Sequence, residues 1–367
     1  MSKTWAIFLI FTSVCTQTAL AQPPVRRFDG PGSPPFKVLN AGENPPLDVN
    51  GNFVIGPEYT LAPERKAVDG VPQGKVKQFT IDSKETKLFN PGIARKAFGK
   101  VDPKNPKTLI VETHNIDYKR QITVYIPAQY KAGSEAPFMV CHDGPTGKPN
   151  MQLPRILDNL IAQKRIPPII AILVANGGGD AQGHERGKEY DTMSGMFADY
   201  IETEVLPRVE KNCEVKLTKD PDGRAAMGIS SGGAAALIMA WYRTNLYHRV
   251  LTISGTFVNQ QWPFNPETPG GAWDFHETII PNGPKKPLRI FISVGDRDLL
   301  NPNVMRDGMH DWVEANNRMA KVLAAKGYHY QYLFCRNSGH GIGNAKVQFL
   351  PHAIEWVWNG YSPKMSK

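Results

Sequence analysis

Residues 224–233 read RAAMGISSGG, and the alanine-rich stretch AAALIMAW follows at 234–241. The first stretch begins with a short apolar run typical of a buried strand, and the second predicts a helix. Between them, Gly228, Ser230 and Gly232 fit the pattern G-x-S-x-G. In a strand–turn–helix setting this pattern predicts a nucleophile elbow, a tight turn that exposes a serine hydroxyl. A glycine-rich turn without chemistry is the alternative interpretation.

A serine hydroxyl becomes a good nucleophile when a histidine accepts its proton and a carboxylate orients that histidine. Two aspartates, Asp296 and Asp298, follow an apolar run that ends at Gly295. His340 lies between glycines after a later apolar run, so the chain order is serine, acid, histidine. Because the sites of open α/β sheets lie at the carboxyl ends of strands, we expect these side chains to meet Ser230 there. The pattern leaves open which aspartate is the acid.

The wider pattern predicts one α/β domain with a mostly parallel central sheet and helices on both faces. Residues 75–82 and 120–127 alternate apolar and polar residues, as half-buried antiparallel strands do. The other predicted strands are continuous apolar runs, which are typical of strands covered on both faces. These runs lie at 137–143, 168–176, 224–229, 249–255, 288–295 and 329–335, and helical patterns lie at 193–205, 234–241, 312–323 and 351–358.

The N-terminal residues predict an exported protein, secreted or periplasmic. Residues 1–21 combine Lys3, a short apolar run and the sequence Ala-Leu-Ala at 19–21, which are the features of a secretory signal peptide. No other run reaches 18 apolar residues, so we expect no membrane span. Residues 22–70 are rich in proline and glycine and predict an extended arm, and residues 71–362 predict the folded domain.

Composition excludes several classes of protein. The 367 residues are 41% hydrophobic and 21% charged, which is ordinary for globular proteins and excludes collagen, coiled coils and wholly disordered chains. The net charge of +9 is spread along the chain without a nucleic-acid-binding motif, so we expect no nucleic-acid partner. The histidines and cysteines lack the spacing of a zinc site, so we expect no metal or cofactor. We expect buried free thiols at Cys141, Cys213 and Cys335.

A set of motifs extends this reading: VYIPAQY (124–130), Asp143-Gly144, Arg186-x-x-Glu189-Tyr190, ExxP (204–207), GISSGG (228–233), VGDRD (294–298) and SGH (338–340). With these motifs, residues 70–362 resemble the Putative esterase family of α/β-hydrolases. That family includes enterochelin esterases, esterase D and the feruloyl esterases of carbohydrate esterase family 1. The resemblance implies an α/β-hydrolase fold and a serine carboxylic-ester hydrolase that forms an acyl-enzyme.

The resemblance also implies roles for individual residues. Ser230 stands at the position of the nucleophile and His340 at the position of the base. Asp298 matches the family's acid position, and Asp296 is the alternative.

An oxyanion hole needs two N–H donors. The resemblance implies the backbone of Ser231 as one donor. The family's second donor follows the Asp-Gly turn, where this chain has Pro145, which carries no N–H. Gly144 is therefore expected to replace it, with Thr146 as the alternative.

Other residues are candidates for binding or bracing the site. Trp262 and Trp273 lie in an aromatic-rich loop and are expected to line a substrate pocket, or alternatively to cover the edge of the sheet. Arg186 and Glu189 are three residues apart and predict an ion pair that braces the site.

The expected substrates are feruloyl or acetyl esters on polysaccharides, or siderophore-type esters, so the partner is a small-molecule or polysaccharide ester. Two alternatives remain open. One is a glycan- or siderophore-binding module without catalysis, and the other is an acyltransferase.

Overall fold

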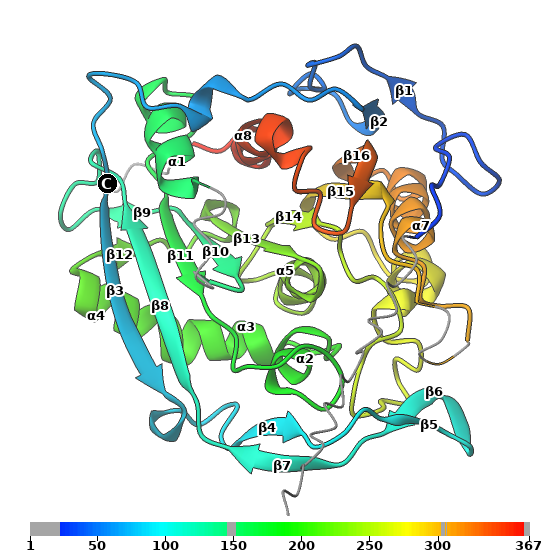
Figure 1. Ribbon diagram of the computed structural model, residues 1–367. Helices are drawn as coiled ribbons and strands as arrows, with labels where there is room; N and C mark the ends of the chain where they lie inside the picture. Colours follow the sequence, from blue (N-terminus) through cyan, green and yellow to red (C-terminus); the bar gives the residue numbers. More distant parts are fainter. Residues whose placement is uncertain (1–22, 145–151, 302–304, 306, 363–367) are drawn as a thin grey trace, which may run out of the picture.

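The computed structural model describes residues 23–144, 152–301, 305 and 307–362, and a ten-stranded sheet forms its centre (Figure 1). From one edge to the other the strands are β1 (Lys37–Val38), β2 (Gly51–Ile55), β16 (His329–Gly339), β15 (Arg289–Arg297), β14 (Arg249–Ile253), β13 (Arg224–Ile229), β10 (Phe138–His142), β11 (Ile170–Val174), β8 (Lys119–Ile126) and β3 (Lys75–Asp82). Neighbouring strands from β1 to β11 run parallel. Strand β8 pairs antiparallel with both β11 and β3. The predicted α/β-hydrolase fold is confirmed.

Helices cover both faces of the sheet, because the central strands are apolar on both sides. Along β10, Phe138 and Val140 belong to one hydrophobic cluster and Met139 and Cys141 belong to the other. The first cluster contains side chains of α3 (Met196–Tyr200), α4 (Leu206–Cys213), α5 (Ser231–Tyr242) and α7 (Trp312–Ala325). The second contains side chains of α1 (Leu153–Ala162) and α8 (Lys346–Trp358).

Smaller elements lie around the sheet. The short helices are α2 (Glu185–Tyr190) and α6 (Ile280–Asn282), and a π-helical segment, Ile201–Val205, joins α3 to α4. Two antiparallel pairs, β4 (Gly92–Arg95) with β7 (Thr113–Ile116) and β5 (Lys100–Asp102) with β6 (Asn105–Ile110), form a rim beside α2 (Figure 1). A third, parallel pair joins β9 (Glu135–Ala136) and β12 (Lys216–Leu217).

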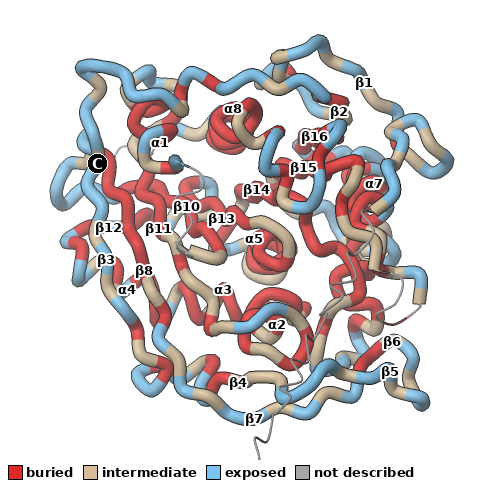
Figure 2. Tube along the Cα trace, in the orientation of Figure 1, coloured by how far each residue is buried: buried red, intermediate tan, exposed pale blue. Residues whose placement is uncertain are grey.

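The N-terminal segment is part of the domain, which corrects the predicted arm at 22–70. Strand β2 pairs with β16 from Gly51 opposite Gln331 to Ile55 opposite Cys335. Phe53, Val54 and Ile55 are buried, and part of β2 is coloured as buried in Figure 2. The strand is only five residues long and lies among glycines and prolines, so the composition of this segment did not predict a strand.

The same segment supplies a hydrogen bond that α8 lacks. Helix α8 begins at Lys346, so Pro351 lies inside it and not at its first position as predicted. Proline has no N–H, which leaves the carbonyl of Val347 without its intrahelical partner. The backbone N–H of Ala62 donates to that carbonyl at 3.0 Å. The N-terminal segment therefore completes the helix that follows His340.

Candidate active site

The turn between β13 and α5 has the geometry of a nucleophile elbow. Ser230 has φ 60° and ψ −129°, a strained conformation for a residue with a side chain. A Cβ atom on Gly228 would lie 2.2 Å from the carbonyl oxygen of Gly232, so the turn closes only when residue 228 has no side chain. The elbow predicted from the sequence is therefore present, with Ser230 partly exposed at the start of α5.

The structure places Asp298, and not Asp296, against His340. Oδ1 of Asp298 lies 2.6 Å from Nδ1 of His340. The side chain of Asp298 is fully buried, whereas 27% of the His340 side chain is exposed. A buried carboxylate on Nδ1 fixes the ring and its tautomer and leaves Nε2 to exchange protons. The indole of Trp312 packs edge-on against the imidazole, with ring centroids 6.1 Å apart.

Asp296 holds the loop that carries His340. Its two carboxylate oxygens accept hydrogen bonds from the backbone N–H groups of Asn337, at 2.8 Å, and Ser338, at 3.0 Å. The side chain is therefore occupied with the backbone just before His340. The two aspartates, which the sequence pattern alone could not distinguish, therefore have different contacts in the structure.

Ser254 was missed by the sequence analysis. Its hydroxyl donates to Oδ2 of Asp298 at 2.6 Å, and its oxygen accepts from the backbone N–H of Gly341 at 2.9 Å. One buried serine thus connects the acid to the residue after His340. Its position directly after β14, at the carboxyl end of a parallel strand, was the available signal.

The hydroxyl of Ser230 contacts Thr256. The two hydroxyl oxygens lie 3.4 Å apart, and Thr256 also accepts a hydrogen bond from the indole N–H of Trp312 at 3.2 Å. Among the described residues no hydrogen bond joins Ser230 to His340. Catalytic hydrogen bonds are often long without substrate and tighten when substrate binds.

The first predicted oxyanion donor is available in this geometry. Ser231 is the first residue of α5, where backbone N–H groups have no partner within the helix. In the described part of the chain this N–H forms no hydrogen bond. A negative charge at the start of α5 would therefore find a free donor.

The second predicted donor, Gly144, is corrected by the structure. Its N–H donates to the carbonyl oxygen of Val174 at 2.9 Å, so it is used within the protein. Pro145 and the alternative donor Thr146 lie outside the described residues.

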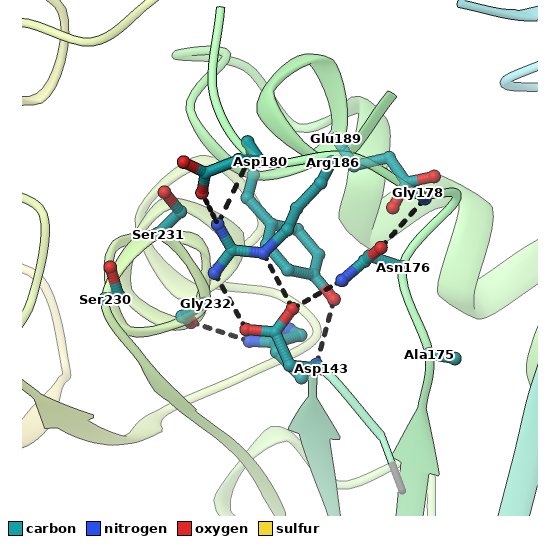
Figure 3. A network of polar contacts seen from close by, with 12 residues as sticks. Asp143, Ala175, Asn176, Gly178, Asp180, Arg186, Glu189, Ser230, Ser231 and Gly232 are labelled. Carbon is teal, nitrogen blue, oxygen red and sulfur yellow. Dashed lines mark hydrogen bonds and ion pairs between the residues drawn. The ribbon is translucent and has the colours of Figure 1, made fainter. Parts of the chain in front are cut away.

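The predicted ion pair between Arg186 and Glu189 is also corrected. Glu189 is fully buried and pairs with the fully buried Arg120. Arg186 instead pairs with Asp143, at 2.8 and 2.9 Å, and with Asp180 at 3.3 Å (Figure 3). Arg120 therefore pairs with Glu189, and Arg186 pairs with the two aspartates. Through Asp143, Arg186 holds the segment at the end of β10 beside the elbow.

The two tryptophans have different surroundings. Trp273 is only 3% exposed, packs against His276 and donates to Glu277, so it belongs to the core and does not line a pocket as predicted. Trp262 is partly exposed and donates to the carbonyl of Leu109 at 3.2 Å. It remains a candidate for substrate contact.

Other expectations concern the rest of the chain. Cys141, Cys213 and Cys335 are buried free thiols, as predicted. Within the described ranges no group of three potential ligands could hold a metal ion. In the same ranges no helix is both long and apolar enough to cross a bilayer.

With this geometry established, comparison with known proteins identifies the family. The sequence profile described as Putative esterase matches residues 113–353. The chain belongs to this family. The resemblance stated from the motifs is confirmed, and with it the assignment to the esterases.

Solved structures of low sequence identity share the fold. A ferulic acid esterase from Anaeromyces mucronatus in complex with ferulic acid superposes with a TM-score of 0.53 at 12% identity, over 80% of this chain and 94% of that one. The enterobactin esterase of Shigella flexneri, with 2,3-dihydroxy-N-benzoyl-glycine present, gives 0.50 at 17% identity, over 82% of this chain and 64% of that one. In another structure of the Shigella enzyme this chain spans 55% of the length. No curated protein matches the chain by sequence.

Proposed function

We propose that the protein hydrolyses carboxylic esters through Ser230, His340 and Asp298. One observation carries the proposal, namely the buried Asp298 carboxylate 2.6 Å from Nδ1 of His340 at the sheet edge that also presents Ser230. Membership of the esterase family supports the reaction class.

In the proposed reaction, Oγ of Ser230 attacks the ester carbonyl while Nε2 of His340 accepts the hydroxyl proton. Asp298 stabilises the imidazolium that forms. The tetrahedral oxyanion accepts a hydrogen bond from the N–H of Ser231, at the positive end of α5. Collapse releases the alcohol, which takes the proton from His340 and leaves an acyl-Ser230 ester. Water, deprotonated by His340, then releases the acid and restores the serine.

The proposed substrates are feruloyl or acetyl esters of polysaccharides, or siderophore-type esters, acted on outside the cytoplasm. The signal-peptide features of residues 1–21 support the location. The structural neighbours include a ferulic acid esterase in complex with ferulic acid and an enterobactin esterase with 2,3-dihydroxy-N-benzoyl-glycine, and both of these ligands carry an aromatic ring. Trp262, partly exposed in the loop after β14, is the candidate to contact that group.

The test compares the wild-type protein with Ser230→Ala on p-nitrophenyl acetate. We expect turnover by the wild type and a loss of at least 10³-fold in the variant. An alkyl fluorophosphonate should label the wild type at Ser230 and leave the variant unlabelled. Equal turnover by both proteins would reject the proposal. A panel of methyl ferulate, acetylated xylan and a catecholate lactone then compares the substrate classes.

A further inference from the structure

Helix α2 contacts both backbone segments that border the proposed oxyanion site. Tyr190 accepts a hydrogen bond from the backbone N–H of Asp143 at 3.0 Å, and Arg186 pairs with the carboxylate of the same residue. Asp143 directly follows β10, so two side chains of α2 hold that segment (Figure 3). Asp191, the C-cap residue that follows α2, contacts the other segment.

Asp191 forms a triangle of hydrogen bonds with Ser231 and Gln260. The hydroxyl of Ser231 donates to Oδ2 of Asp191 at 3.2 Å. The amide of Gln260 donates to the same carboxylate oxygen and to Oγ of Ser231, each at 3.1 Å. Asp191 and Ser231 are 2% and 1% exposed, so water hardly competes for these contacts. The side chain of the residue after the nucleophile is thereby tied to α2.

This carboxyl group is costly to bury. Oδ1 of Asp191 is buried and has no hydrogen-bond partner among the residues that the structure describes. Burial raises the pKa of Asp191 to about 7, against the lowering effects of Arg186 and of hydrogen bonds from Gln260 and Ser231. A neutral side chain of similar shape would avoid this cost, which makes a purely structural role a poor explanation.

We infer that Asp191 is a positioning residue of the esterase, holding Ser231 through its hydroxyl so that the Ser231 N–H stays directed at the oxyanion. The inference rests on the proposed function. It adds a residue that touches no reacting atom and acts through the proposed oxyanion donor.

The ionised form of Asp191 is the form that holds the triangle more strongly. A carboxylate accepts hydrogen bonds from the hydroxyl and the amide more strongly than a neutral carboxyl does. Two charged groups bear on its ionisation: Arg186 on α2 favours it, and Asp180 in the preceding loop opposes it. Ser231 on α5 and Gln260 after β14 are uncharged. Protonation of Asp191 should therefore weaken the hold on Ser231 and lower turnover by about the same factor as a neutral side chain at this position.

The experiment measures kcat/KM of wild type and Asp191→Asn on p-nitrophenyl acetate from pH 4.5 to pH 8. We expect the ratio of wild-type to variant kcat/KM to rise from about 1 at the acid end to about 10 at pH 8, because only the wild type has a group that ionises at this position. At pH 8 the variant should lose about tenfold in kcat, with KM little changed, because a hydrogen bond to a charged group is lost. Wild-type kcat in the variant at pH 8, or a ratio that does not change with pH, would overturn the inference.

Two further variants keep the test decisive. Ser231→Ala retains the backbone N–H and removes the tie, so it should also lose about tenfold in kcat even if Asp191→Asn fails to fold. Wild-type kcat in Ser231→Ala would overturn the inference independently. Glu185→Gln is the matched control, because Glu185 lies on α2, its Oε1 is buried without a hydrogen-bond partner among the described residues, and burial raises its pKa to about 7. The ratio of wild-type to Glu185→Gln kcat/KM should not change over the same pH range. Failure of the proposed function itself would appear separately, as full activity in Ser230→Ala.

Discussion

The hydroxyl of Ser254 donates to Oδ2 of Asp298 at 2.6 Å, on the carboxylate oxygen that His340 does not use. The backbone N–H of Leu299 donates to the other oxygen at 2.8 Å. Three donors therefore hold one fully buried carboxylate. Because Ser254 also accepts from Gly341, movement of the acid and movement of the histidine loop are coupled through this serine.

Ser254→Ala should lower kcat by about 10- to 100-fold with little change in KM, because a hydrogen bond to a charged group contributes about 1.5–3 kcal/mol. Steady-state kinetics on p-nitrophenyl acetate measures this. Ser293→Ala is the matched control, since Ser293 is also fully buried but its hydroxyl has no hydrogen-bond partner in the described part of the chain. Equal losses in the two variants would contradict a specific role for Ser254.

Replacing the two aspartates separately should give different results. Asp298→Asn should lower turnover by about 10⁴-fold, because the amide favours the wrong histidine tautomer. Asp296→Asn places an NH₂ group against backbone N–H donors, so it should lower the free energy of unfolding by about 1–3 kcal/mol and reduce activity less. Kinetics and urea unfolding of both variants measure these effects. Loss of turnover in Asp296→Asn with near-normal Asp298→Asn would exchange the roles.

The tight turn of the elbow predicts a difference between two glycines. In Gly228→Ala the new methyl group would overlap the backbone of Gly232, which cannot rotate away as a side chain could. We expect a loss of about 2–4 kcal/mol in unfolding free energy together with loss of turnover. Gly343→Ala is the control, because no atom lies within 4 Å of the added carbon. Similar stability of the two variants in urea unfolding would contradict the strained turn.

The sequence predicted the sheet and placed Ser230 and His340 at its same end, because continuous apolar runs locate parallel strands and parallel strands have their carboxyl ends on one side. The choice of Asp298 came from a family resemblance, since two aspartates two residues apart fit the pattern equally. The structure distinguishes them because an oxygen of Asp298 contacts Nδ1 of His340, whereas the oxygens of Asp296 accept hydrogen bonds from backbone N–H groups. These contacts depend on how the loops are arranged in space.

Two of the incorrect predictions, the Arg186–Glu189 ion pair and the Gly144 donor, share a cause, which is competition from residues distant in sequence. Spacing placed Glu189 beside Arg186, but Arg120 from β8 takes that carboxylate in the core. Gly144 has an N–H in the right segment, but the carbonyl of Val174 accepts it. Local sequence cannot show these partners.

Because the N-terminal segment pairs with β16, we predict that the domain does not fold normally when residues 23–70 are removed. Removing residues 23–70 would expose β16 as a sheet edge and uncover the surface that Phe53 and Ile55 bury. It would also remove Tyr59, whose hydroxyl donates to the carbonyl of Arg336 at 2.5 Å beside the histidine loop. A chain starting at residue 71 should be insoluble or lack cooperative unfolding, whereas one starting at residue 23 should unfold cooperatively. Circular dichroism during heating compares them, and equal unfolding midpoints would contradict this role.

The buried carboxyl of Asp191 also predicts how stability depends on pH. Folding raises its pKa from 3.8 to about 7, so between these values the folded state binds more protons than the unfolded state. The contribution of Asp191 is therefore fully present below about pH 4 and is lost as pH rises through about 7. Asp191→Asn does not titrate, so the unfolding free energy of the variant minus that of the wild type should increase from pH 4 to pH 8, by up to about 4 kcal/mol. Any effect of the amide that is independent of pH cancels in this comparison, and Glu185 contributes equally to both proteins. Urea unfolding at a series of pH values measures the difference, and a constant difference would show that Asp191 is not held protonated by burial. The expected result, a variant whose stability relative to the wild type rises with pH while its turnover is slower, is the exchange of stability for activity that a positioning carboxylate implies.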